Sequence, residues 1–328
     1  MRALFWAVLA AVLLYSGYWV VGRWQVETRL SDALVALSDQ GWEVDYASLT
    51  TRGFPSRFDT TATDLVVGTP DGRLRYETPI LQVLALSYRP NRLIAAFAPS
   101  QVVTVDGQTV AVTSEDLRAS LRVGLSTALP LEEVRVAGTD VGVAPAGRPG
   151  LSMGTLSLAA RRAEGQAVYR LGLEATGLRP LSDDAEGGAA ALGGRVALDR
   201  VHLDATATLD APLDRRSRAA PRLLALSLAD LSASVGGASL VVTGDFAPDA
   251  TGALAGEGRV ALRDWRALLD ALERAGFVPP ERRGLVEGAL GGLSRGQPDI
   301  EVPVTLADGW VSALGMRLVE APRMPQRQ

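Results

Sequence analysis

The stretch His202-Leu-Asp-Ala-Thr-Ala-Thr-Leu209 decides the fold, because apolar and polar residues alternate along it. A period of two is typical of a β-strand with one buried and one solvated face. Shorter runs with the same tendency recur at 43–49, 73–76, 102–105, 133–136, 155–159, 168–173, 195–198, 240–246 and 255–262. Turn dipeptides such as Asp71-Gly72 and Asp106-Gly107 separate them. The sequence therefore predicts a mainly β protein, an elongated antiparallel sheet without βαβ crossovers.

An uncharged apolar run at residues 3–21 precedes the strands. About 19 helical residues at 1.5 Å each come close to the roughly 30 Å of a bilayer's hydrocarbon core. Four aromatic residues lie at the end of the run: Tyr15, Tyr18, Trp19 and Trp24. They resemble an interfacial belt, whereas a cleaved signal peptide needs small residues there. We expect an uncleaved transmembrane anchor in the inner (cytoplasmic) membrane, with the bulk of the chain in the periplasm.

The changes of period along the chain suggest its domain organisation. An amphipathic helix is predicted from the spacing of Val26, Leu30, Leu34 and Leu37, with Gly41 at its end. We expect a transmembrane anchor at 1–22, a juxtamembrane helix at 23–41, a first β region at 42–181, a linker candidate at 182–194, a second β region at 195–322 and a tail at 323–328.

Helix returns near the C-terminus as a predicted hairpin at 264–294. Asp264 is placed to cap the first helix, and Pro279-Pro280 begins the second. The apolar residues expected to face inward are Trp265, Leu268, Leu269 and Leu272, then Leu285, Val286, Ala289, Leu290 and Leu293. A terminal strand pair at 300–306 and 310–314, turning at Asp308-Gly309, should close one end of the sheet.

Composition excludes several classes of function. The formal net charge is −4, and no basic stripe is present to hold phosphate backbones, so nucleic acid is not an expected partner. The chain has no Cys and a single His, His202, which excludes disulfides, thiolate chemistry and a Cys/His metal cage. We predict no cofactor, no metal-binding residue and no catalytic residue.

Two short motifs resemble catalytic or cofactor signatures. Gly150-Leu-Ser152-Met-Gly154 fits the nucleophile pattern G-x-S-x-G, and His202 would be the only histidine base for a hydrolase. An alternating run follows the motif instead of a helix, which favours a turn that enters a strand. Gly256-Glu-Gly258 resembles part of a dinucleotide fingerprint, but it lies inside an alternating run. We interpret it as a strand thinned by glycines for close packing.

Two further clusters have structural interpretations. Asp183, Asp184 and Glu186 carry the oxygens that hard cations prefer, but in a Gly/Ala-rich segment they are interpreted as solvated acids. The segment 52–59, Arg-Gly-Phe-Pro-Ser-Arg-Phe-Asp, is interpreted as a corner in which Phe54 and Phe58 both anchor inward. The alternative for this segment is an exposed docking site.

Three segments carry a family resemblance: the N-terminal run, Gly41-Trp-Glu-Val-Asp-Tyr46 and Gly53-Phe54-Pro55-x-Arg57-Phe58-Asp59. They make the chain similar to a proteobacterial envelope family, domain of unknown function 2125. Glu301-Val-Pro-Val-Thr-Leu-Ala-Asp-Gly309 resembles the closing hairpin of that family. The resemblance spans nearly the whole chain and implies an inner-membrane protein, without functional residues to transfer. The order of anchor, meander and helical hairpin also resembles AsmA-type envelope proteins, whose long sheets are associated with lipid handling; such a likeness does not establish function.

These observations favour a non-enzymatic envelope component that binds lipid or an envelope partner. Strand faces suited to an acyl chain carry Leu156 and Leu158, Leu171 and Leu173, and Leu203 with Ala205 and Ala207. The alternatives are a hydrolase that uses Ser152 and His202, and a structural scaffold protein of the envelope.

Overall fold

The computed structural model describes residues 2–163, 167–181, 197–216, 221–274 and 278–323; side chains at 2–5, 7, 8 and 10–13 lie outside the description. The chain forms two compact units, Met1–Arg122 and Val123–Gln328. The linker candidate at 182–194 falls within the second unit and outside the described residues, as does the tail beyond residue 323.

The first unit begins with one continuous helix, α1 (Arg2–Asp39), which spans both the predicted anchor and the predicted juxtamembrane helix. Gly41, with φ of 86°, follows the helix and donates its N–H to the Ser38 carbonyl, as predicted for a C-cap. Among the residues that the structure describes, no helix combines the length and apolarity needed to cross a membrane. The span at residues 3–21 stays a prediction, because most side chains before Leu14 are not described.

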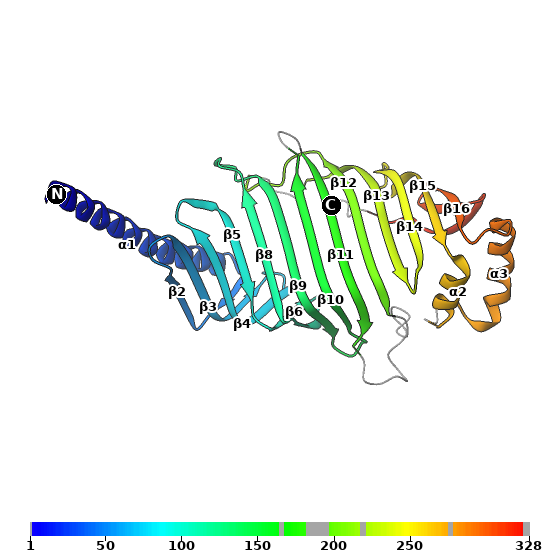
Figure 1. Ribbon diagram of the computed structural model, residues 1–328, viewed down its shortest axis with the longest axis horizontal. Helices are drawn as coiled ribbons and strands as arrows, with labels where there is room; N and C mark the ends of the chain where they lie inside the picture. Colours follow the sequence, from blue (N-terminus) through cyan, green and yellow to red (C-terminus); the bar gives the residue numbers. More distant parts are fainter. Residues whose placement is uncertain (1, 164–166, 182–196, 217–220, 275–277, 324–328) are drawn as a thin grey trace. The chain divides into compact units, whose positions relative to one another are not determined.

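The strands of the first unit form an antiparallel sheet (Figure 1). They are β1 (Glu43–Asp45), β2 (Ser48–Arg52), β3 (Arg57–Gly68), β4 (Leu74–Leu86), β5 (Arg89–Phe97), β6 (Ser100–Val105), β7 (Gln108–Thr113) and β8 (Asp116–Val123). One edge of β4 pairs first with β6 and then with β5, and these two strands in turn pair with β7 and β8. Strands β5 and β6 are therefore one long strand interrupted at 98–99.

The strands of the first sheet are interrupted at matching positions in neighbouring strands. Asp64 in β3 has φ of 49°, Pro79 removes a backbone donor from β4, and Ala98 and Ser114 separate β5 from β6 and β7 from β8. Ser114 N–H donates to the Pro99 carbonyl at 2.9 Å, which bridges two of the interruptions. The sheet consequently bends along one line that crosses its strands.

The second unit is a meander in which each strand pairs antiparallel with the next one in the chain. The strands are β9 (Leu131–Pro145), β10 (Leu151–Arg162), β11 (Val168–Pro180), β12 (Leu198–Leu209), β13 (Leu223–Val235), β14 (Ala238–Pro248), β15 (Leu254–Arg263), β16 (Ile300–Ala307), β17 (Trp310–Ala313) and β18 (Met316–Glu320). The predicted mainly β, antiparallel fold is confirmed, and so is the terminal pair, to which β18 adds a third strand.

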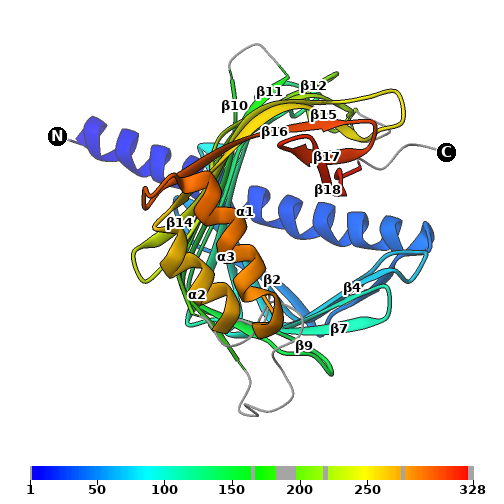
Figure 2. The same ribbon diagram turned by 90° about the vertical axis from the view of Figure 1, so that its right-hand side faces the viewer.

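Helices α2 (Trp265–Arg274) and α3 (Pro280–Ser294) lie side by side at the β15–β16 end of this unit (Figure 2). Asp264 caps α2 as predicted, because its carboxylate accepts the Ala267 N–H at 3.3 Å. The inward face of α3 is narrower than predicted. Val286 and Leu290 pack against a core of Trp265, Leu269 and Ile300, whereas Leu285, Ala289 and Leu293 are exposed. Helix α3 packs against α2 and β16, and only the narrow stripe that faces them is buried.

Candidate functional site

The strand registers of the second unit gather its apolar side chains on one face. Val136, Leu158, Leu173, Leu203, Leu231, Val242, Val260 and Val302 are successive Cα partners and form one row across β9–β16. A parallel row contains Gly138, Leu156, Ala175, Val201, Ala233, Leu240, Leu262 and Ile300. A third contains Val134, Ala160, Leu171, Ala205 and Leu228. We call these three rows the apolar face.

The opposite face of the same strands is polar. Ser157, Glu174, His202 and Ser232 are Cα partners across β10–β13, one residue away from the central apolar row. Arg200 donates to Glu174 at 3.2 Å and lies beside His202 on this side. A one-residue step along a strand changes the face, so the sheet is amphipathic throughout β10–β13.

The C-terminal elements cover only part of the apolar face. Helices α2 and α3 pack on its β14–β16 end, around Ile300, Leu262 and Val302. A second cluster joins Phe246, Leu254 and Leu306 to Ala321, next to β17 and β18. In the described part of the second unit, no helix packs on β9–β13. The leucines there are only half-buried, and Leu231 is 40% exposed.

One end of the β9–β12 region is closed by irregular backbone. The Tyr169 hydroxyl accepts the Leu213 N–H at 2.9 Å, and Leu131 N–H donates to the Leu213 carbonyl at 2.7 Å. Tyr169 and its register partner Ala207 are buried, as is Ala205. The two alanines therefore belong to the packed end, and the half-buried leucines supply the accessible surface.

The hydrolase pair predicted as an alternative does not assemble. His202 is level with Ser157, five residues along β10 from Ser152, a separation of about 17 Å along the strand. Ser152 and His202 also lie on opposite faces of the sheet. The Ser152 hydroxyl donates to the Arg179 carbonyl at 3.2 Å, and β10 begins at Leu151. The motif is a turn that enters a strand, and these two residues cannot form a nucleophile–base pair.

Two further candidates from the sequence are the glycines at 256 and 258 and the acidic residues at 183–186. Gly256 and Gly258 lie inside β15, which confirms the glycine-thinned strand. Asp183, Asp184 and Glu186 lie outside the described residues. Among the described residues, no group of three or more His, Cys, Asp or Glu side chains is placed to hold a metal ion.

The corner at 52–59 contacts helix α1, a contact that the pattern of the sequence does not predict. Trp19, predicted as part of an interfacial belt, is only 7% exposed; its ring lies edge-on to Phe54 at 5.3 Å and stacks on Phe58 at 6.2 Å. Its indole N–H donates to the Arg57 carbonyl at 2.9 Å. Phe54, predicted to anchor inward, remains 54% exposed because the helix contacts only one side of the corner.

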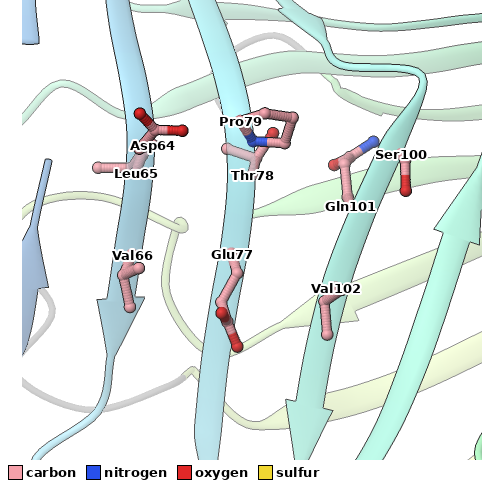
Figure 3. Close-up of a pocket in the computed structure, with 9 residues that line it drawn as sticks. All are labelled: Asp64, Leu65, Val66, Glu77, Thr78, Pro79, Ser100, Gln101 and Val102. Atoms are coloured by element: carbon pink, nitrogen blue, oxygen red, sulfur yellow. The ribbon is translucent and has the colours of Figure 1, made fainter. Parts of the chain in front are cut away.

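A pocket of about 310 Å³ lies on the bend of the first sheet (Figure 3). Its lining residues are Asp64, Leu65 and Val66 on β3, Glu77, Thr78 and Pro79 on β4, and Ser100, Gln101 and Val102 on β6. Gln101 accepts the Tyr76 hydroxyl at 2.6 Å and donates to the Ala98 carbonyl at 3.3 Å. Thr78 donates to the Ile80 carbonyl at 3.0 Å. These buried polar groups therefore already have hydrogen-bond partners within the sheet.

Burial raises the pKa of the Tyr76 phenol, which keeps its proton on the bond to Gln101. This bond is a structural tie between β4 and β6. The apolar face of the second unit is therefore the candidate binding surface, and the ligand that it suits is apolar.

Comparison with known proteins gives a family without an assigned activity. A family described as an uncharacterized protein conserved in bacteria matches residues 19–322. No curated protein and no solved structure matches the chain.

Proposed function

This chain belongs to the DUF2125 family of uncharacterized proteins conserved in bacteria, and that description names no function. We therefore propose a function from the structure of the apolar face. The protein is a non-enzymatic component of the cell envelope that binds the acyl chains of lipid on β9–β13. The apolar N-terminal part of α1 anchors it to the inner membrane, and the two units lie in the periplasm. The uncharged run at residues 3–21 supports the anchor.

The continuous central row supports acyl binding. Neighbouring strands are about 4.8 Å apart, so the row from Val136 to Leu231 is roughly 19 Å long. One acyl chain covers half of a hydrocarbon core, about 15 Å. A chain lying across the strands would therefore fit between β9 and β13. Contiguous apolar surface that other elements leave uncovered is a feature of interaction sites.

The composition of the rows also suits an acyl chain. Across β9–β13 they contain only Val, Leu, Ala and Gly, so no polar side chain of the rows loses a hydrogen-bond partner, a loss that costs about 1–3 kcal/mol. Each buried methylene contributes about 0.8 kcal/mol, so several methylenes offset the ordering of a flexible chain.

Two substitutions on one strand test the proposal. Leu231→Glu places a charge on the apolar face, and Ser232→Glu places the same charge on the polar face one residue further along. The full-length wild type, extracted in mild detergent, should carry lipid detectable by mass spectrometry. We expect Leu231→Glu to reduce this lipid at least tenfold and Ser232→Glu to retain it.

Thermal unfolding of both variants provides the control for folding. Leu231 is partly exposed, so its substitution should leave the unfolding temperature near that of Ser232→Glu. A wild type that carries no lipid, or equal lipid in both variants, contradicts acyl binding. A scaffold protein would give the first of these results.

A further inference from the structure

Two turns of the first unit and helix α1 are joined at one end of the sheet. The turn at 53–56 connects β2 to β3, and the turn at 87–88 connects β4 to β5. Ser87 N–H donates to the Ser56 carbonyl at 3.0 Å. The Tyr15 hydroxyl donates to the Pro55 carbonyl at 2.9 Å, and the Tyr18 hydroxyl to the Ser87 carbonyl at 3.5 Å. The N-terminal part of α1 continues beyond β2 and β3 (Figure 1).

Exposed aromatic side chains concentrate at this end. In the described part of the chain, the strongly exposed aromatics are Trp6, Tyr15, Tyr18, Trp24, Phe54 and Tyr88. All six belong to α1 or to the two turns. We call Tyr15, Tyr18, Phe54 and Tyr88, which surround the contact between helix and turns, the aromatic collar. Tyr88 is 65% exposed and lies under the Arg89 guanidinium, at 6.0 Å.

The opposite end of the same sheet is charged. Its turns at 69–73 and 106–107 carry Asp71, Arg73 and Asp106, and Arg73 pairs with Asp106 at 2.6 Å. The Arg73 hydrogen bond lowers the pKa of Asp106, which strengthens the preference of this carboxyl group for its charged form. The two ends of the first unit therefore suit different surroundings, one amphipathic and one aqueous.

The aromatic collar overlaps the apolar run in sequence. Residues 15–21 lie within the uncharged run 3–21, and about six helical steps correspond to roughly 9 Å. The same stretch of α1 contacts the turn at 53–56. Lipid that surrounds the run must therefore reach the two turns.

Several backbone carbonyls in and next to the turns are already hydrogen-bonded within the protein. The Gly53 carbonyl accepts the Arg57 N–H, the Pro55 and Ser87 carbonyls accept the two tyrosine hydroxyls, and the Arg57 carbonyl accepts the indole of Trp19. Unsatisfied backbone groups cost several kcal/mol in hydrocarbon, so such pairing lowers the cost of entering a bilayer. Tyrosine rings at this position suit the headgroup level of a membrane.

We propose that the aromatic collar sits in the lipid interface, with the turns at 53–56 and 87–88 at headgroup depth and Arg89 at the lipid phosphates. The occupant of this surface is the bilayer itself, and the inference rests on the proposed membrane attachment through α1. The first unit then stands with its charged turns farthest from the membrane.

The absence of cysteine allows a direct test by site-directed spin labelling. Arg89→Cys places a nitroxide beside the aromatic collar and keeps all four aromatics; Gln108→Cys places one at the charged end, at an exposed position. The full-length variants are reconstituted into vesicles of phosphatidylcholine and phosphatidylglycerol. We expect the label at 89 to collide several-fold more often with oxygen than with a water-soluble nickel complex, and the label at 108 to show the reverse.

Flotation separates this inference from the proposed attachment. If the protein floats with the vesicles but both labels favour the nickel complex, the attachment holds and the aromatic collar does not contact lipid. If the protein does not float with the vesicles, attachment and collar are both overturned. A lipid-accessible label at 89 together with a water-accessible label at 108 supports the inference.

Discussion

At the scale of single residues, glycines make room for an aromatic ring. Phe246 shares a face of β14 and β15 with Gly244, Gly256 and Gly258. A Cβ on Gly244 would lie 2.6 Å from the Phe246 Cζ, and one on Gly258 would lie 3.1 Å from it. Gly256 has φ of 149° and would place a Cβ 2.1 Å from the Asp245 carbonyl oxygen. The predicted thinning of β15 therefore has two causes: the Phe246 ring and the Thr243 carbonyl lie close to Gly258, and the Asp245 carbonyl lies close to Gly256.

The substitution Gly258→Ala should destabilise the second unit by about 1–3 kcal/mol, because the added methyl group meets the Thr243 carbonyl oxygen at 2.6 Å. The matched control is Gly172→Ala in β11, where the nearest atom is 3.9 Å away. Urea unfolding followed by circular dichroism measures both variants. Equal midpoints for the two alanine variants would contradict this account of the glycines.

Asp249, in the turn between β14 and β15, gives a pH dependence. Its carboxylate accepts the Thr251 hydroxyl at 2.7 Å and the Thr251 N–H at 2.7 Å, and these bonds lower its pKa. A carboxyl group with a lowered pKa stabilises the fold above its unfolded pKa, near 3.9, and loses this effect as the pH falls through the folded value. Asp249→Asn should therefore flatten the loss of stability below about pH 4. Parallel unfolding curves for wild type and variant across pH 3–6 would refute the contribution.

At the scale of elements, α1 is held against the first sheet by contacts along its length, and the most buried of its aromatic side chains there is an indole ring. Trp19 is buried against the corner, and Gly22 lets the helix approach Phe58, since a Cβ there would lie 2.8 Å from the Phe58 Cζ. Further along the helix, Glu27 accepts the N–H of the buried Thr51 at 2.7 Å. These contacts join residues about 24–40 positions apart in the sequence. Periodicity therefore predicts the helix but not the elements that it packs against, the corner at 52–59 and β2.

Trp19→Ala should cost about 3–5 kcal/mol of local stability, as for other buried tryptophans. Trp24→Ala is the matched control, because Trp24 lies on the same helix and is 66% exposed. Hydrogen exchange of β2 and β3 in the full-length protein reports the difference. Faster exchange only in Trp19→Ala supports the contact, and identical protection in both variants contradicts it.

Alternation predicted most strands, and its failures have local causes. Strand β13 was missed because its register against β12 shifts between Asp204 and Ala205, and a bulge moves the alternation by one residue. The five apolar residues of α3 were expected inward, but only Val286 and Leu290 have a partner surface. Sequence periodicity shows that a face exists, whereas the neighbouring element decides how much of it is buried.

At the scale of the whole molecule, the strand faces of the candidate site could be predicted, but their register could not. Leu158, Leu173 and Leu203 were each assigned to an apolar strand face, and pairing places them in one row. Leu231 completes the row from the strand that was missed. Ala205 and Ala207 are predicted beside the ligand and are instead buried near Tyr169, because the segment around Leu213 folds back onto Tyr169, 44 positions away in the sequence, and alternation does not predict that contact.

The sequential pairing of β9 to β18 also has an evolutionary consequence. From β10 to β17, each strand pairs with the strands before and after it in the chain, so a duplicated hairpin would insert between two neighbours and leave the other pairings unchanged. Such a duplication would lengthen the three rows by about 10 Å, two strand spacings. The length of the apolar face is therefore inherited in whole hairpins and can change by gene duplication without a new fold.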